Sequence, residues 1–352
     1  MPPADSPPRL VLASLATSVA MGQQAYERNL AAALGRVAGD AWQVRECPVH
    51  SLRSRATTGR RLPLRAVAGL PAPAARWAGR LTYGPAEVVH RLDLRLPPAG
   101  VPEVLTVHDL APLHFADEGA LPPGWRQSVR RAAVVVAPSV FAAAEIEAAT
   151  GVRPVVVHHG ADRDLAEAEP LGRVELAALG IRHPYVLHAG GSTARKNLAG
   201  LAEAWRAVHR SRPDCMLVLC GPADARRDAL FAGVGGTVRP GHLPRSTLAG
   251  LRRGAALVVV PSTYEGFGLP ALEAMTAGVP VVAAARGALP EIVGDAGLLV
   301  EPTGPALADG ILAALSDPAV GARAARNRDR ARSRTWDDVA TDHLALYRRA
   351  LA

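Results

Sequence analysis

Two glutamates, Glu265 and Glu273, enclose a glycine-containing turn that leads into a predicted helix. Pro270 suits the first turn of a helix, where no backbone donor is lost. The amides of Gly268 and Leu269 would then be free to bind a phosphate, with the helix dipole behind them. Carboxylates at such a site can accept hydrogen bonds from sugar or ribose hydroxyls. Either glutamate alone would be a solvated residue near a helix start, but the whole string indicates a phosphate and sugar site, with Glu273 in the first turn of the helix.

A second candidate for anion binding is Lys196, which is the single lysine among 40 Lys and Arg residues. Where arginine fills nearly every basic position, a lone lysine is either a chance occurrence or indicates a place that favours a compact ammonium over a planar guanidinium. Arg195 precedes it, in the loop after the apolar run 185–189. Both side chains could neutralise a diphosphate. The alternative interpretation is an exposed lysine near a helix start.

Length and composition restrict the class of protein. The chain has 352 residues, a net charge of +8 and an apolar fraction of 49%. This length suits two domains of about 150–180 residues, and the charge suits anionic ligands. No apolar run approaches the roughly 18–20 residues that span a bilayer, and the first residues do not resemble a secretory signal. Cys47, Cys215 and Cys220 are expected to be reduced thiols of a cytoplasmic protein.

Short apolar runs alternate with amphipathic helical patterns through nearly the whole chain. Continuous apolar runs fit parallel strands that are buried on both faces. The alternation predicts an α/β fold with two doubly wound sheets, whose ligands would collect in the loops after the strands. The domain boundary is expected within 161–183, and a final helix at 336–351. The expected strands are 10–15, 104–107, 134–137, 155–158, 185–189, 216–220, 257–260 and 279–283.

The string from Glu265 to Glu273 resembles the E-x7-E signature of family 4 glycosyltransferases. That family has the GT-B fold, in which two Rossmann-like doubly wound domains face a central cleft. The resemblance implies an acceptor-binding domain at 1–165, a nucleotide-sugar-binding domain at 166–335, and a C-terminal helix at 336–352 that packs back on the first domain. Further matching motifs are the 188–197 loop, Gly278-Val-Pro-Val, Gly287-Ala-Leu-Pro-Glu291, Asp295-Ala-Gly-Leu-Leu-Val and, as in the mannosyltransferase-like branch, Val89-His-Arg-Leu-Asp and Thr106-Val-His108-Asp109-Leu.

The resemblance also implies roles for individual residues. Arg195 and Lys196 would bind the donor diphosphate, Glu265 the hydroxyls of the donor sugar, and Glu273 the ribose of the nucleoside. His108 would lie beside the anomeric centre, although a histidine at a strand end can also be a core residue. The further donor-binding candidates are Gly22, Gly221, His242, Leu243, Gly266, Phe267, Gly268 and Leu269.

Two places depart from the family pattern. Family members carry two adjacent glycines in the first loop, where this chain has Met21-Gly22-Gln-Gln. The pattern Asn-Gly-Val-Asp before the interdomain linker is here His159-Gly160-Ala161-Asp162. The first departure concerns the acceptor side of the site, and the second concerns local turn chemistry.

The stretch 51–80 carries seven arginines and no acidic residue. It is either a surface for anionic lipid headgroups or a phosphorylated acceptor, or a solvated and partly mobile loop. A lipid surface would place the protein peripherally at the inner face of the cell membrane. Nucleic acid is not an expected partner, because no recognition motif accompanies the charge. The seven are Arg53, Arg55, Arg60, Arg61, Arg65, Arg76 and Arg80.

Taken with the resemblance, these residues predict a retaining glycosyltransferase that uses a nucleotide sugar, with GDP-mannose as the first donor hypothesis. The acceptor would be a glycan, a lipid-linked molecule or a small molecule. No cofactor and no metal are implied, and the histidines lack metal-ligand spacing. A sugar-nucleotide epimerase of the same fold is one alternative, and a non-catalytic binding or scaffold protein is another.

Overall fold

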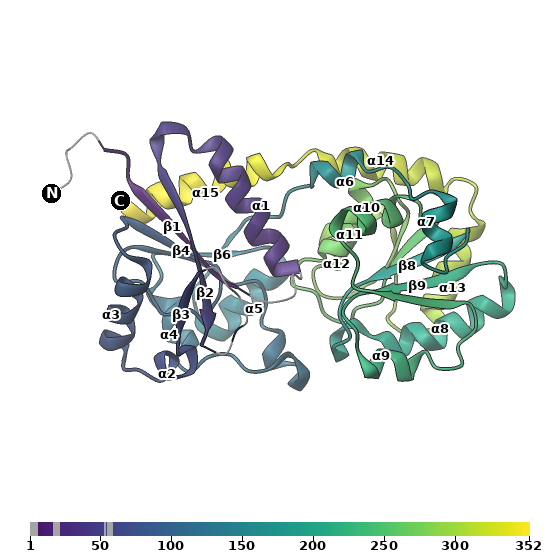
Figure 1. Cartoon of the computed structure of the whole chain (residues 1–352), viewed down its shortest axis with the longest axis horizontal. Coiled ribbons are helices and arrows are strands. Elements are labelled where there is room, and N and C mark those ends of the chain that lie inside the picture. Colours follow the sequence, from purple (N-terminus) through teal and green to yellow (C-terminus); the bar gives the residue numbers. More distant parts are fainter. Residues whose placement is uncertain (1–5, 17–21, 53, 55–58) are drawn as a thin grey trace. The chain divides into compact units, whose positions relative to one another are not determined.

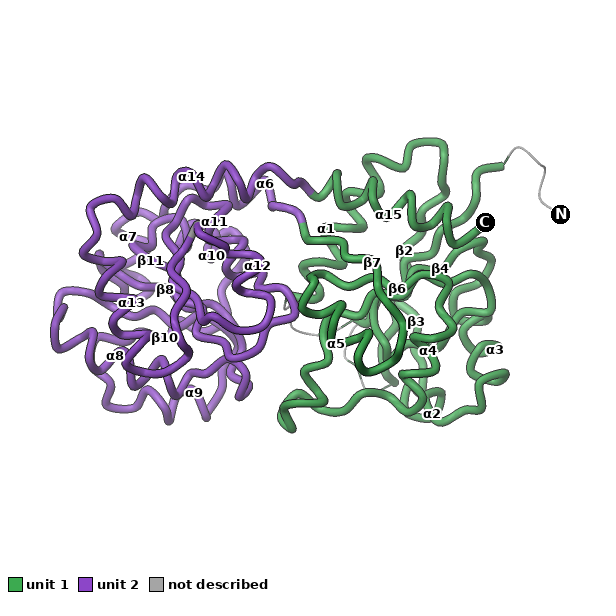
Figure 2. Tube along the Cα trace, turned by 180° about the vertical axis from the view of Figure 1, so that it is seen from behind, with its two compact units in different colours: residues 1–159, 336–352 green, residues 160–335 purple. Residues whose placement is uncertain are grey.

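A computed structural model describes residues 6–16, 22–52, 54 and 59–352. The chain divides into two compact units (Figure 1, Figure 2). Unit 1 holds the described residues up to His159 together with Trp336–Ala352, and unit 2 holds Gly160–Thr335. The division therefore lies a few residues before the expected 165/166 boundary, and the last helix belongs to unit 1. Within the described residues, no helix is both long enough and apolar enough to cross a membrane.

Unit 1 is built on a parallel sheet whose described strands run in the order β3-β2-β1-β4-β5-β6-β7. Strands β4, β5 and β6 are buried along their whole length, as expected for strands with helices on both faces. The strands are β1 (Arg9–Leu15), β2 (Gln43–Ser51), β3 (Arg60–Leu62), β4 (Val88–Arg91), β5 (Glu103–Thr106), β6 (Val134–Ala137) and β7 (Val155–Val156).

Helices cover both faces of this sheet (Figure 1). Because side chains alternate along a strand, Leu10 and Leu12 of β1 pack with α1 and α15, whereas Val11 and Ala13 pack with α3. Helices α4 and α5 pack on β5 and β6. The helices are α1 (Gly22–Val37), α2 (Leu64–Ala68), α3 (Ala72–Tyr83), α4 (Trp125–Arg131), α5 (Val140–Thr150) and α15 (Trp336–Leu351), with 3-10 turns at Gly39–Ala41, Ala111–Leu113 and Ala116–Glu118.

The Arg-rich stretch 51–80 forms regular structure where the structure describes it. It supplies β3, α2 and most of α3, so its interpretation as a loop is wrong for these residues. The reason is tertiary, because Val67 and Ala75 are buried against the rest of unit 1, whereas the five described arginines of the stretch are exposed. Arg53 and Arg55 lie outside the described residues.

Unit 2 contains a second parallel sheet, with its described strands in the order β10-β9-β8-β11-β12-β13. One face packs against α10, α11 and α12, and the other against α8 and α13. The strands are β8 (Tyr185–Ala189), β9 (Met216–Cys220), β10 (Thr237–Gly241), β11 (Leu257–Val260), β12 (Val281–Ala284) and β13 (Leu298–Val300). The helices are α6 (Arg163–Glu167), α7 (Arg173–Ala178), α8 (Leu198–Ser211), α9 (Ala225–Leu230), α10 (Arg245–Arg253), α11 (Leu269–Thr276), α12 (Leu289–Val293), α13 (Gly304–Ser316) and α14 (Val320–Arg332), with 3-10 turns at Ala194–Lys196 and Gly294–Ala296.

The predicted α/β architecture with two doubly wound parallel sheets is confirmed. The ends of four expected strands differ. The strand at 10–15 begins one residue earlier as Arg9–Leu15, 104–107 shifts to Glu103–Thr106, 155–158 shortens to Val155–Val156, and 279–283 shifts to Val281–Ala284. Strands β2, β3, β4, β10 and β13 were not predicted. In β2 and β10, exposed positions interrupt the apolar runs.

A chain of buried polar side chains ties α15 to the sheet of unit 1. Tyr347 Oη lies 2.8 Å from Nδ1 of His90, whose Nε2 lies 2.7 Å from Thr106 Oγ1. From α1, Tyr26 Oη lies 3.4 Å from the same threonine hydroxyl and 3.1 Å from Nε2 of His343. His343 Nδ1 donates to a carbonyl of its own helix at 2.8 Å. Because unpaired polar groups are costly to bury, these contacts fix α15 in a specific place.

This network makes the stability of unit 1 sensitive to acid. Burial lowers the pKa of His90 well below its ordinary value, and the neighbouring histidines lower it further. The stability that the neutral form contributes is present above the ordinary pKa of about 6.5 and is lost below it, by up to about 1.4 kcal/mol per pH unit. We expect urea unfolding, followed by tryptophan fluorescence, to show this loss between about pH 7 and about pH 5.

Two variants separate His90 from the other titrating groups. His90→Gln should be less stable than the wild type at neutral pH, with a smaller dependence on pH. His114→Gln is the matched control, because His114 is 47% exposed in its pair with Glu145, and it should keep the wild-type dependence. Equal pH dependence in His90→Gln and the wild type would contradict this assignment.

Candidate active site

Two loops of unit 2 meet at the carboxyl ends of the neighbouring strands β8 and β11. The first loop carries Arg195 and Lys196 in a 3-10 turn, and Asn197, with a φ of 52°, caps α8 directly after it. Asn197 Nδ2 donates to the Pro261 carbonyl at 3.0 Å. The amide of Thr263 donates to the Arg195 carbonyl at 2.8 Å. The two cations are thereby held against the loop that follows β11.

The side chain of Glu265 joins the two loops through ion pairs. Its Oε1 lies 2.6 Å from Lys196 Nζ, and its Oε2 lies 3.0 Å from Arg195 Nη1. Ser262 Oγ also donates to Oε1, at 2.8 Å. Burial of this side chain, which is 5% exposed, would by itself raise the pKa of Glu265. The charges of Lys196 and Arg195 outweigh that effect and lower the pKa to about 2, so the carboxylate is ionised near neutral pH.

Helix α11 begins beside this cluster with a glycine that no other residue could easily replace. Gly268 has a φ of 101°, and a Cβ there would lie 2.8 Å from Leu289 Cδ2. Pro270 occupies the first turn, as predicted. Among the described residues, the amides of Gly268 and Leu269 make no hydrogen bond. Two donors at a helix N-terminus can bind an anionic oxygen.

The structure corrects the expected position of Glu273. Since α11 begins at Leu269, Glu273 lies in the second turn and not in the first. Its Oε2 lies 2.6 Å from Nη2 of Arg252 in α10, and the Arg252 side chain is buried. Glu265 and Glu273 therefore belong to two separate ion-pair clusters.

His188, near the end of β8, is a site residue that the sequence did not single out. Its Nδ1 lies 3.2 Å from the Val259 carbonyl oxygen, which can only accept, so Nδ1 carries the proton and Nε2 has a lone pair. Nε2 is buried and has no hydrogen-bond partner in the described structure. Burial lowers the pKa of His188 to about 4, with contributions from Lys196 and Arg227. A neutral imidazole acceptor thus lies close to the cations.

Arg227, in α9, is the second residue that sequence reasoning missed. Its guanidinium is 2% exposed and donates from Nη2 to the Pro222 carbonyl at 2.6 Å. Its Nε and Nη1 make no hydrogen bond among the described residues. A Cβ on Gly221 would lie 2.0 Å from the Gly190 carbonyl oxygen and 2.9 Å from Arg227 Nη1, so only glycine fits there. Nothing in the sequence distinguishes this arginine from the many others.

The loops that carry the donor-binding candidates Gly221, His242 and Leu243 lie side by side. The amide of Gly221, after β9, donates to the Gly241 carbonyl, at the end of β10, at 3.0 Å. His242 follows and is exposed, and Leu243 is partly buried against the core of unit 2. Gly266 and Phe267 lie in the loop between Glu265 and α11, where Phe267 is a core residue.

Two predicted site residues belong to unit 1. His108 follows β5, with its ring edge against Tyr26 at a centroid distance of 4.9 Å, and its Nε2 is buried without a partner among the described residues. Burial lowers the pKa of His108. Gly22 begins α1 and is exposed, whereas Met21 lies outside the described residues.

Next to Gly22, a pair of buried carboxyl groups is a feature that the sequence did not indicate. Gln23 Nε2 lies 3.0 Å from Glu27 Oε1 and 3.0 Å from Asp93 Oδ2. Burial raises the pKa of Glu27 to about 8, and the charge of Asp93 contributes. Arg95 pairs with Asp93, and its charge lowers the pKa of Glu27 by less than burial raises it. Glu27 is therefore largely protonated near neutral pH.

The arrangement in unit 2 suits an anionic ligand. Three cations, Arg195, Lys196 and Arg227, accompany two carboxylates, the buried Glu265 and the more exposed Asp224, and the free amides of α11 begin beside Glu265. Such a set can neutralise a phosphate group and stabilise a leaving diphosphate. The described residues contain no group of three or more His, Cys, Asp or Glu that could hold a metal ion.

Comparison with known proteins identifies the family. A model of the family described as Glycosyl transferases group 1 matches residues 183–317. O-antigen chain mannosyltransferase B of Escherichia coli is 36% identical over 196 residues, which are 53% of this chain and 50% of that protein. Alpha-maltose-1-phosphate synthase of Mycolicibacterium smegmatis is 32% identical over 294 residues, which are 72% of this chain and 74% of that protein. The chain belongs to this family, and it is a glycosyltransferase.

Solved structures show the same fold at lower identity. Sucrose-phosphate synthase from Thermosynechococcus elongatus has a TM-score of 0.77 at 24% identity, covering 97% of this chain and 98% of that one. HepE of Anabaena, in complex with UDP-glucose, has a TM-score of 0.74 at 19% identity, covering 96% of this chain and 100% of that one. The predicted GT-B fold class is thereby confirmed.

The buried ion pairs predict a large loss of stability when Lys196 is neutralised. Removing one partner of a buried pair costs about 3–5 kcal/mol, because a buried charge is left uncompensated. Since Arg195 remains beside Glu265, we expect Lys196→Met to lower the free energy of unfolding of unit 2 by about 3 kcal/mol. Urea unfolding followed at Trp205, the one tryptophan of unit 2, measures this loss.

An exposed ion pair provides the matched control. Arg286 and Glu301 pair at 2.6 Å with side chains 46% and 59% exposed, so Arg286→Met should change the free energy of unfolding by at most about 1 kcal/mol. If both variants lowered the free energy of unfolding equally, the buried ion pairs of Glu265 would not stabilise unit 2 more than an exposed pair does.

Proposed function

We propose that this glycosyltransferase transfers a hexosyl residue from a nucleoside diphosphate sugar to an acceptor hydroxyl, with retention of the anomeric configuration. GDP-mannose is the proposed donor, because the Escherichia coli relative is named a mannosyltransferase. A UDP sugar is the next donor to consider, because the HepE structure contains UDP-glucose. The proposed acceptor is a glycan, a lipid-linked molecule or a small molecule.

The observation that carries this proposal is the buried cluster of Glu265, Arg195 and Lys196. Lys196 Nζ donates to one acceptor among the described residues, Glu265 Oε1, although an ammonium has three donors. The remaining N–H groups and the excess positive charge suit a diphosphate, whose negative charge grows as it leaves. The amides of Gly268 and Leu269 would add two donors for a phosphate oxygen.

Glu265 is proposed to bind a hydroxyl of the donor sugar as well. A carboxylate has about four acceptor sites, and three are taken by Lys196, Arg195 and Ser262, so one is left. Glu273 is proposed to bind the ribose hydroxyls. The other proposed donor contacts are Gly22, Gly221, His242, Leu243, Gly266 and Phe267.

The proposed reaction exchanges two bonds on one face of the anomeric carbon. The bond to the leaving phosphate oxygen breaks while the bond to the acceptor oxygen forms, and the acceptor proton passes to the leaving phosphate. Arg195, Lys196 and the first amides of α11 would stabilise the charge that develops on the diphosphate. His108 is proposed to act beside the anomeric centre, and its unpartnered Nε2 would bind a sugar hydroxyl. No metal and no other cofactor are part of this proposal.

Donor binding is tested by thermal shift with GDP-mannose, UDP-glucose, ADP-glucose and dTDP-glucose. We expect GDP-mannose to raise the Tm most, since a ligand at about 100 times its Kd stabilises a protein by about 2.7 kcal/mol. Arg195→Gln should weaken the apparent affinity for the donor at least tenfold, and the Tm shift should fall accordingly. Arg206→Gln, which changes an exposed arginine of α8, is the control and should keep the wild-type shift.

Product analysis completes this test. With an acceptor present, the enzyme should release the nucleoside diphosphate and form a glycoside of unchanged anomeric configuration. Conversion of the donor to an epimer without acceptor would replace the proposal by the epimerase alternative. If none of the four donors shifted the Tm, the assignment of a nucleotide-sugar site would be wrong.

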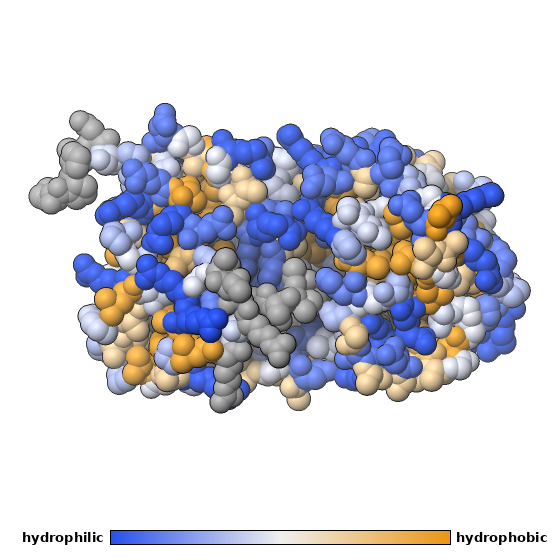
Figure 3. Space-filling model, viewed as in Figure 1, coloured by the Kyte–Doolittle hydropathy of each residue, from blue (hydrophilic) through white to orange (hydrophobic). Residues whose placement is uncertain are grey.

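We also propose that unit 1 docks on the inner face of an anionic cell membrane. Arg60, Arg61 and Arg65 are exposed, and the apolar side chains of Trp77 and Leu81 are 66% and 55% exposed. Figure 3 shows hydrophobic and strongly hydrophilic surface next to each other over α2 and α3. Basic side chains attract anionic headgroups, and apolar ones enter the interface.

Vesicle co-sedimentation tests this docking. The protein should bind vesicles that contain phosphatidylserine at low salt and not those of phosphatidylcholine alone, because each arginine contributes about 1 kcal/mol near an anionic surface and salt screens it. Replacing Arg60, Arg61 and Arg65 by Gln should release it. The matched control replaces the exposed Arg173, Arg206 and Arg210 of unit 2. Absence of vesicle binding at low ionic strength would refute the membrane surface.

A further inference from the structure

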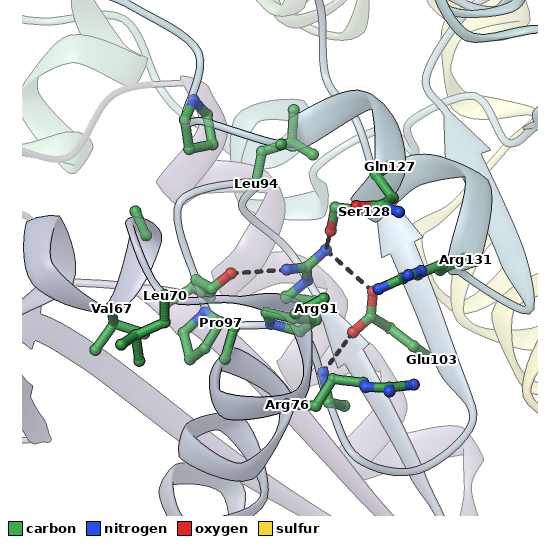
Figure 4. A pocket seen from close by; sticks show the side chains of 18 of the residues that line it. Val67, Leu70, Arg76, Arg91, Leu94, Pro97, Glu103, Gln127, Ser128 and Arg131 are labelled. Carbon is green, nitrogen blue, oxygen red and sulfur yellow. Dashed lines mark hydrogen bonds and ion pairs between the residues drawn. The ribbon is translucent and has the colours of Figure 1, made fainter.

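A cavity of about 730 Å³ lies within unit 1 (Figure 4). Its described lining comes from α2, α3, α4 and the loop between β4 and β5. Its lining includes Leu96 and Ala99 from one core cluster of unit 1 and Trp125 from another. Cavities of roughly 300–1,000 Å³ hold small organic ligands. None of the residues assigned above to the donor site lines it.

The floor of the cavity is a buried ion pair. Arg91, which is 1% exposed, donates from Nη1 to the Leu96 carbonyl at 2.7 Å, and its Nη2 lies 3.0 Å from Glu103 Oε1. Glu103 Oε2 accepts from the Ala99 amide at 2.7 Å. The carboxylate is therefore already compensated. Arg91 Nε has no hydrogen-bond partner among the described residues, although a buried donor without a partner costs free energy.

The walls carry an excess of positive charge. Among the described lining residues are five arginines and one acid, Glu103. Arg95 is paired outside the cavity with Asp93, at 2.5 Å. In the described part of the chain, the guanidinium groups of Arg76 and Arg131 make no hydrogen bond and no ion pair. The cavity therefore has positive charge that the described residues leave uncompensated, and this charge suits an anion.

The opposite wall is apolar. In Figure 4, Val67, Leu70 and Pro97 lie on one side of Arg91, and Arg76 and Arg131 lie on the other. The apolar lining reaches the surface, because Leu70 is 41% exposed and Trp77, which also lines the cavity, is 66% exposed. A ligand that fits both walls has a charged head and an apolar chain.

We propose that this cavity binds a phosphorylated amphiphile, in which a phosphate or diphosphate ester lies among Arg76, Arg91 and Arg131 and an apolar chain follows Leu70 and Trp77. This inference rests on the proposed function and deepens it, because it names the acceptor as lipid-linked. A fatty alcohol without phosphate would leave the cations unpaired, and a phosphorylated sugar would leave the apolar wall uncovered.

Calorimetric titration of the full chain with farnesyl phosphate tests this inference. Farnesyl phosphate should bind at least tenfold more tightly than farnesol, which lacks the charge, and than inorganic phosphate or inositol phosphate, which lack the chain. The double change Arg76→Gln and Arg131→Gln should weaken farnesyl phosphate binding at least tenfold. The matched control, Arg206→Gln with Arg210→Gln, should bind as the wild type does.

The outcomes separate this inference from the proposed function. Equal binding of farnesyl phosphate and farnesol, or an unchanged affinity in the Arg76 and Arg131 variant, would overturn it. Equal binding of inositol phosphate would overturn the amphiphile in favour of a small phosphorylated acceptor. Thermal shifts with the donor on the same samples distinguish the two claims. If the wild-type protein binds the nucleotide sugar but not farnesyl phosphate, the proposed function stands and this inference is wrong.

Discussion

The buried charge of Glu265 is the constraint on which the site in unit 2 depends. An ionised carboxylate in this position would cost several kcal/mol if it were alone, and it is compensated by Arg195 and Lys196, which lie 70 and 69 residues earlier in the chain. Only the adjacency of β8 and β11 in the sheet brings these groups together. Because the carboxylate holds both cations in place before any ligand arrives, the site is preorganised for negative charge.

In each unit a buried carboxylate holds arginine at a candidate ligand site, but the surroundings differ. In unit 2 the cations lie beside glycine-rich loops and the free amides of α11, which allow a compact diphosphate to approach the backbone closely. In unit 1 the pair of Arg91 and Glu103 forms the floor of a larger cavity with one apolar wall. The first arrangement suits a nucleotide sugar, and the second suits an anion with an apolar chain.

Two buried histidines are both kept neutral but differ in their hydrogen bonds. Burial keeps His90 and His188 neutral. Both ring nitrogens of His90 have partners within unit 1, so this residue belongs to the structure that fastens α15. Nε2 of His188 has no partner among the described residues, although buried polar atoms are nearly always paired. That difference is consistent with a structural histidine in one unit and a ligand-binding one in the other.

The amino-acid sequence by itself determined the fold class, the family and the loops that carry the site. Strands β8, β9 and β11 were predicted with their observed ends, because burial on both faces requires continuous apolar runs. The turn of Gly268 and Pro270 was predicted because its chemistry is local. Only the tertiary structure decided that Glu265 pairs with Lys196, that Glu273 lies one turn further into α11, and that Arg227 is buried. Ion pairs between distant segments and the burial of one arginine among many leave no periodic signal in the chain, since both follow from how the strands are ordered in the sheet.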